Sequence, residues 1–100
     1  MISLVVSKNG VPIRLTDERW AHVIEEHGEL ADLRQKVLQT VAEPERIVEG
    51  KAGELLALRE LETGKSLVVV YREGTDDGFV ITAFLIRRLR AFEKRRQVWP

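Results

Sequence analysis

Apolar and polar residues alternate at the start of the chain in the way that two short strands require. The runs Ile2 to Lys8 and Val11 to Leu15 are rich in valine, isoleucine and leucine. They flank Asn9-Gly10, a dipeptide typical of the tight turn in a β-hairpin. The sequence therefore predicts that the chain opens with two antiparallel strands.

The pattern then changes to a helical period of about 3.6 residues. Thr16 is suited to cap the first turn of this helix, and Gly28 to end it in a left-handed conformation. One side of the predicted helix collects the following residues: Trp20, Val23, Ile24 and His27. A second run of apolar residues at the same period predicts another helix over about residues 30 to 42, which Pro44 ends.

Beyond Pro44 the pattern returns to that of strands separated by turn-forming residues. The predicted strands cover residues 46–48, 54–61, 66–73 and 79–86. Val69 and Ile81 lie in the middle of the two most apolar runs, so we expect both to be almost fully buried on adjacent strands. The last segment, 87–99, has helical propensity and is predicted as a short helix.

This order of elements predicts an α+β fold, in which two helices pack on one face of an antiparallel sheet of four or more strands. The length of 100 residues predicts a single domain over residues 1–100. Without cysteine the chain offers no disulfide and no thiolate metal site, and without a signal-peptide pattern it is expected to be cytoplasmic. No apolar run reaches the roughly 20 residues of a membrane span.

Charge is balanced overall, with 16 basic and 16 acidic side chains, but it is unevenly distributed. Acidic residues crowd the first predicted helix, whereas the segment from Arg87 to Arg96 carries six basic residues and one acid, Glu93. Such a basic segment either contacts phosphate groups or is a solvated helical face at the C-terminus.

Both histidines of the chain lie in the first predicted helix. His22 is about 140° from His27 around the helix, unlike the two zinc-binding histidines of the HExxH motif, which share one face. We therefore expect no metal and no cofactor. On an apolar stripe His27 is either a structural histidine or a proton-transfer group, and His22 by itself reads as an exposed helix residue.

Two strand residues join the histidines as candidates. Arg59 shares a predicted strand face with apolar residues, so it is either an edge-strand arginine or a group that awaits a ligand. Thr82 alternates with Val80 and Phe84, which predicts that the three share a face. Together, two imidazoles, a guanidinium and a hydroxyl suit RNA cleavage by the 2′-hydroxyl, because this reaction needs a base, an acid and a cation near the phosphate.

The stretches LTDERWAHVIEEH, AEPERIVEG, LVVVYRE and VITAF resemble phage-associated members of the barnase–EndoU–colicin–RelE-like (BECR) nuclease superfamily. The resemblance spans about residues 13 to 88, and it implies a RelE/BECR-like sheet and metal-independent endoribonuclease activity. His22, His27 and Thr82 match the family's helix histidines and strand threonine, and Arg59 matches its basic strand residue. The candidate RNA-binding residues are Lys51, Tyr71, Arg87, Arg88 and Arg90.

Two functions are consistent with these patterns. The first is an endoribonuclease of a toxin–antitoxin or phage-derived system, with RNA as substrate and an antitoxin or immunity protein as partner. The second is a catalytically silent domain on the same fold that binds RNA or protein. The two differ in whether the four candidate catalytic residues converge on one cleft.

Overall fold

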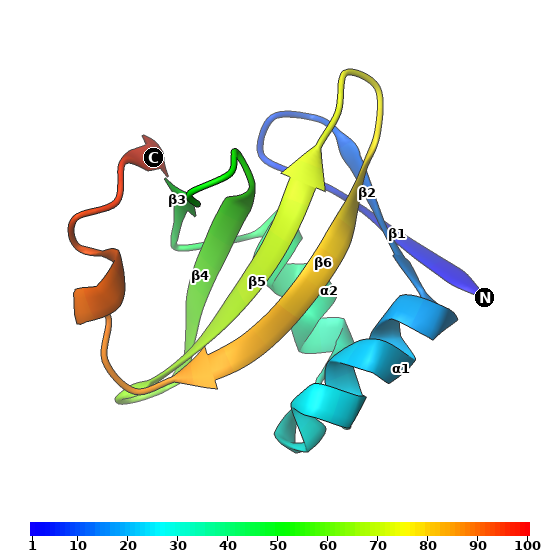
Figure 1. Cartoon of the computed structure of the whole chain (residues 1–100), viewed down its shortest axis with the longest axis horizontal. Helices are drawn as coiled ribbons and strands as arrows, with labels where there is room; N and C mark the ends of the chain where they lie inside the picture. Colours follow the sequence, from blue (N-terminus) through cyan, green and yellow to red (C-terminus); the bar gives the residue numbers. More distant parts are fainter.

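The computed structural model describes all residues, 1–100, as one mixed sheet with two α-helices and two short 3₁₀ helices (Figure 1). The strands and helices, in chain order, are β1 (Ile2–Val6), β2 (Pro12–Thr16), α1 (Asp17–Glu26), η1 (Gly28–Leu30), α2 (Arg34–Ala42), β3 (Arg46–Glu49), β4 (Leu55–Glu62), β5 (Lys65–Glu73), β6 (Gly78–Ile86), η2 (Arg90–Phe92) and β7 (Gln97–Trp99). The α+β class predicted from the sequence is confirmed.

The predicted N-terminal hairpin is confirmed. β1 and β2 pair antiparallel from Ile2 opposite Thr16 to Val6 opposite Pro12. Gly10 closes the turn at φ 81°, a left-handed conformation that glycine adopts without a steric cost. Thr16 then caps α1, because its hydroxyl oxygen accepts a hydrogen bond from the Arg19 amide at 3.0 Å.

The sheet has seven strands in the order β1-β2-β6-β5-β4-β3-β7. All neighbours are antiparallel except β2 and β6, which pair in parallel at Ile13 opposite Gly78 and Arg14 opposite Phe79. The prediction of a purely antiparallel sheet was therefore wrong at this junction. The hairpin β1–β2 precedes the helices, and strands β3 to β6 follow them. A long crossover connection therefore joins β2 to β6, which allows these two strands to pair in parallel.

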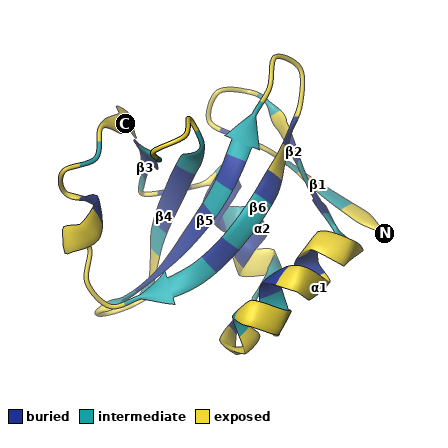
Figure 2. Ribbon diagram, viewed as in Figure 1, coloured by how far each residue is buried: buried dark blue, intermediate teal, exposed yellow.

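One face of the sheet packs against the helices. Trp20 and Val23 of α1 lie in the same buried cluster as Val37 and Val41 of α2. The sheet residues of this cluster are Ile13, Leu15, Ile47, Ala57, Leu67, Val69, Tyr71, Val80 and Ala83. The opposite face has a smaller cluster in which Phe92 of η2 covers Val48, Leu56, Leu58 and Val68. Figure 2 shows buried positions along β4 and β5, and mostly intermediate positions along β6.

Val69 and Ile81 were both predicted to be almost fully buried, and the prediction is confirmed for one of them. Val69 is fully buried, as predicted. Ile81 is only half-buried, so the prediction for this residue was wrong. A β-bulge causes the difference: Val70 pairs with Thr82 and Tyr71 with Val80, which leaves Ile81 without a partner on β5.

Three helix predictions also differ from the structure. α1 ends with His27 as its C-cap, as the sequence predicts, but Gly28 starts the 3₁₀ helix η1 instead of adopting a left-handed conformation. The second helix is shorter than predicted, Arg34–Ala42. The segment 87–99 forms no α-helix, because Phe92 packs on the sheet and β7 pairs with β3. No helix of the structure has the length and apolar character needed to cross a membrane.

Candidate functional site

A groove of about 420 Å³ lies between α1 and β6. Its lining residues are Arg19, His22, Val23, Glu26, His27, Ile81, Thr82 and Phe84. The groove thus gathers both histidines, a guanidinium, a carboxylate and a hydroxyl from two elements that are more than fifty residues apart in the chain. Figure 1 shows these two elements side by side, with α1 along the outer side of β6.

The α1 side of the groove follows from helical spacing. Arg19, His22 and Glu26 are separated by three and four residues, so they lie on one side of the helix. All three are exposed, and Thr16 at the N-cap holds the helix in register with the end of β2. This side therefore presents its polar groups to solvent and to any molecule in the groove.

His27 reaches the same groove by a different route. It is the C-cap of α1, with φ −132° and ψ 68°, so its side chain does not follow the helical projection. Its ring centroid lies 6.1 Å from that of Phe84, at an interplanar angle of 38°. Val23 lies between the two histidines around the helix, and the groove extends to both sides of it. The calculated angle of about 140° therefore does not keep the histidines in separate sites.

On the β6 side the bulge decides which way Thr82 points. Val80 packs in the helix-side core, whereas Thr82 pairs with Val70 and Phe84 pairs with Val68, whose side chains belong to the opposite face. The prediction that Thr82 shares a face with Val80 was therefore wrong. Bulges re-aim side chains in this manner and are frequent next to active sites. Thr82 is half-buried and lines the groove.

Arg59 does not join this groove. It pairs with Leu67, whose side chain lies in the helix-side core, and its Nη1 donates a hydrogen bond of 2.5 Å to the carbonyl oxygen of Glu43. Glu43 is the C-cap of α2, so Arg59 stabilises the end of that helix. Three of the four candidate catalytic residues are thus brought together, and the fourth lies on the other face of the sheet.

The cation of the groove is Arg19, which the sequence patterns did not single out. Its Nη1 donates a long hydrogen bond of 3.5 Å to the carbonyl oxygen of Ile81, and the residue forms no ion pair. The signal was present in the sequence, because Arg19 precedes His22 by three residues and Glu26 by seven, the spacing of one helix face.

Of the candidate RNA-binding residues, Tyr71 is buried. It is 0% exposed in the helix-side core, and its hydroxyl has no hydrogen-bond partner. Burial, followed by the nearby charge of Glu73, raises the pKa of Tyr71 above its usual range. Its assignment to RNA binding was therefore wrong, because a ligand cannot reach this side chain.

The other candidates for RNA binding are exposed. Lys51 lies in the turn between β3 and β4, which β5 separates from β6. Arg87, Arg88 and Arg90 follow the end of β6 directly, on the path from the groove toward η2. The arginines are thus continuous with the groove along the chain, whereas Lys51 is remote from it.

No group of three or more His, Cys, Asp or Glu side chains in the structure is placed to hold a metal ion. Comparisons of the chain with protein-family models, curated proteins and solved structures gave no match. The chemistry and geometry of the groove are therefore the observations that bear on function.

Proposed function

We propose that this protein is a metal-independent endoribonuclease and that the α1–β6 groove is its active site. The observation that supports the proposal is the convergence of His22, His27 and Thr82 with Arg19 on one groove. Isolated histidines on a helix are usually structural, but two imidazoles that share a groove with a guanidinium supply all the groups that transesterification of RNA requires.

In the proposed reaction the 2′-hydroxyl of the substrate attacks the adjacent phosphorus atom. One imidazole accepts the proton of that hydroxyl, and the other donates a proton to the departing 5′-oxygen. The products are a 2′,3′-cyclic phosphate and a free 5′-hydroxyl. Arg19 stabilises the charge that develops on the phosphoryl oxygens, in the role first expected of Arg59, and the Thr82 hydroxyl donates a hydrogen bond to the same oxygens.

The surroundings of the groove suit a long, anionic substrate. His22, Arg19 and Glu26 are exposed and His27 is half-buried, so a phosphate group can reach both imidazoles from solvent. Arg87, Arg88 and Arg90 extend a basic surface beyond the end of β6. If the protein belongs to a toxin–antitoxin or phage-derived system, its antitoxin or immunity protein acts by covering this groove.

The test is to incubate the purified protein with a mixture of tRNA and messenger RNA in EDTA and to map the ends of the fragments. The proposal predicts cleavage in the presence of EDTA and 2′,3′-cyclic phosphate ends. Cleavage that stops in EDTA and returns with zinc or manganese would exclude the metal-free mechanism.

A second arm separates the nuclease from a silent binding domain. The double variant His22→Ala/His27→Ala is compared with wild type for cleavage and for RNA binding, with circular dichroism as the control for folding. The nuclease proposal requires that the double variant lose cleavage. RNA binding without cleavage by the wild-type protein would instead support the binding domain.

A further inference from the structure

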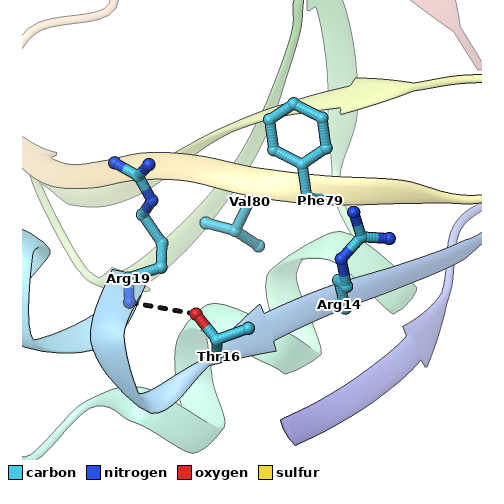
Figure 3. A pocket seen from close by; sticks show the side chains of 5 residues that line it. All are labelled: Arg14, Thr16, Arg19, Phe79 and Val80. Carbon is cyan, nitrogen blue, oxygen red and sulfur yellow. Dashed lines mark hydrogen bonds between the residues drawn. The ribbon is translucent and has the colours of Figure 1, made fainter.

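A second cavity, of about 240 Å³, lies beside the groove on the same side of β6 (Figure 3). Its lining residues are Arg14, Thr16, Arg19, Phe79 and Val80. Arg19 belongs to both cavities, so the two are contiguous at this side chain. Figure 3 shows Arg14 on β2 and Arg19 on α1, with both guanidinium groups directed toward β6.

Phe79 makes this cavity unusual. It is 39% exposed, although it stands next to the buried Gly78 and Val80 in the sheet. The guanidinium carbon of Arg14 lies 5.8 Å from the centroid of its ring, within the range of a cation–π contact. An exposed aromatic ring in a cavity lined by two arginines is a combination that proteins use to stack a nucleic-acid base and hold its phosphate.

Electrostatics of the cavity favour a phosphate. Nη1 of Arg14 pairs with Asp77 at 2.6 Å, which orients the guanidinium and leaves its other nitrogen donors free of protein hydrogen bonds. Arg19 forms no ion pair. Two positive charges therefore face one negative charge, and the cavity keeps a net positive charge for an anionic group.

The position of the cavity relates it to the groove. Phe79 precedes Thr82 by three residues on β6, roughly 10 Å at the rise of an extended strand. That separation is within the length of a short oligonucleotide. We infer that the Arg14–Phe79–Arg19 cavity is a nucleotide subsite for single-stranded RNA, in which Phe79 stacks on an unpaired base that flanks the cleaved phosphate.

The placement of that base beside a cleaved phosphate rests on the proposed function, whereas the binding of single-stranded nucleic acid does not. The inference excludes duplex RNA as the preferred ligand, because the bases of a duplex are stacked on one another and cannot stack on Phe79.

The experiment measures binding of fluorescent oligonucleotides by anisotropy, with 2′-deoxy strands that cannot undergo 2′-hydroxyl attack. Phe79→Ala should weaken binding about 5- to 150-fold, because stacking contributes about 1–3 kcal/mol per base. Phe79→Tyr should bind as wild type does, and Phe79→Leu, which stays apolar but cannot stack, should resemble Phe79→Ala.

Salt dependence separates the two parts of the subsite. Arg14→Gln should lower the slope of log affinity against log salt by about 0.7, the value for one phosphate contact in a single strand. Phe79→Ala should leave this slope unchanged. Two control variants, Lys36→Gln on the exposed side of α2 and Leu4→Ala on β1, should change neither the affinity nor the slope.

Each outcome has one meaning. Equal affinity of wild type and Phe79→Ala would overturn the subsite and leave the nuclease proposal intact. Weakened binding by Phe79→Ala in a protein that cleaves no RNA would support the subsite and refute the nuclease. The subsite would also be overturned if wild type bound no single strand, or if Phe79→Ala weakened the binding of an acidic peptide but not that of the 2′-deoxy strand.

Discussion

The two faces of the sheet differ in how they are closed. On the helix side, 15 buried residues form one continuous cluster, in which Leu67, Val69 and Tyr71 of β5 are fully buried. On the other side, η2 covers residues of β3, β4 and β5 but not β6, and the cluster has five buried residues. Val70, Thr82 and Phe84 remain partly open there. The closed face sustains the fold, and the open part, next to α1, offers polar groups to a ligand.

The two faces thus predict opposite responses to substitution. Changes on the helix side should alter stability, in most cases lowering it, and leave cleavage per folded molecule unchanged. Changes in the groove should lower cleavage and leave stability unchanged.

The largest effect is expected at the histidine that borders Phe84. His27→Ala removes a proton-transfer group, so the rate of RNA cleavage should fall about 10²- to 10⁴-fold. The melting temperature should stay close to that of wild type, because the His27 side chain is half-buried and makes no hydrogen bond in the structure. A variant that cleaves RNA normally but melts well below wild type would show that His27 is structural and would leave His22 as the remaining candidate.

The largest effect on stability is expected in the helix-side core. Leu67→Ala should lower the free energy of unfolding by about 2–5 kcal/mol, since Leu67 is fully buried and its loss leaves a cavity. For a domain of this size the melting temperature should fall by about 10 °C or more. The control is Leu4→Ala, because Leu4 is 65% exposed and should tolerate the change. Similar melting temperatures for Leu67→Ala and wild type would refute the core assignment.

Thr82→Val tests the groove with a smaller change. The substitution keeps the shape of the side chain and removes the hydroxyl, which should lower cleavage roughly 10- to 100-fold, as expected for the loss of a hydrogen bond to a charged oxygen. The free energy of unfolding should change by less than about 1 kcal/mol. Thr40→Val is a matched control outside the groove, because the Thr40 hydroxyl donates to a carbonyl within α2. Unchanged cleavage by Thr82→Val would show that the hydroxyl takes no part.

The smallest effect concerns Tyr71, whose buried hydroxyl lacks a partner. Tyr71→Phe should raise the free energy of unfolding by about 1 kcal/mol, because the cost of burying an unpaired hydroxyl disappears. The raised pKa also has a consequence at high pH. Above about pH 10 an unfolded tyrosine loses its proton while folded Tyr71 keeps it, so wild type should lose stability as pH rises there.

The measurement for Tyr71 is chemical denaturation of both proteins at pH 7 and between pH 10 and 11. The difference in stability between Tyr71→Phe and wild type should widen at the higher pH. A constant difference would show that the pKa of Tyr71 is not raised by folding.

Local patterns were sufficient for most elements of this fold. Asn9-Gly10, the Thr16 cap and the β-branched run around Val69 each specify a local structure through backbone conformation or burial. The parallel pairing of Arg14 with Phe79 could not be predicted in this way, because it joins residues 65 positions apart and depends on how the crossover packs.

The candidate site was predictable in its helix but not in its strand. Residues of β6 are apolar on both sides of Thr82, so no polar residue marked the bulge at Ile81, and simple alternation placed Thr82 on the wrong face. Alternation on β4 correctly predicted that Arg59 shares a face with apolar residues. It could not predict that α2 packs on that face of the sheet. The helical spacing of Arg19 with His22 and Glu26 was a usable signal for the cation of the groove, but only the structure shows that Arg59 lies outside the groove.

We propose that the α1–β6 groove is the catalytic site and that Arg19, rather than Arg59, is its cation. The most direct test compares Arg19→Gln with Arg59→Gln in RNA cleavage and thermal unfolding. Arg19→Gln should lower cleavage about 10²- to 10³-fold, as for the loss of one group that stabilises an oxyanion, with unchanged melting. Arg59→Gln should lower the free energy of unfolding by about 1 kcal/mol, and with it the melting temperature, because the hydrogen bond to Glu43 is lost. The folded Arg59→Gln protein should cleave RNA normally. The reverse result, normal cleavage by Arg19→Gln and lost cleavage by folded Arg59→Gln, would contradict the claim and place the chemistry on the other face of the sheet.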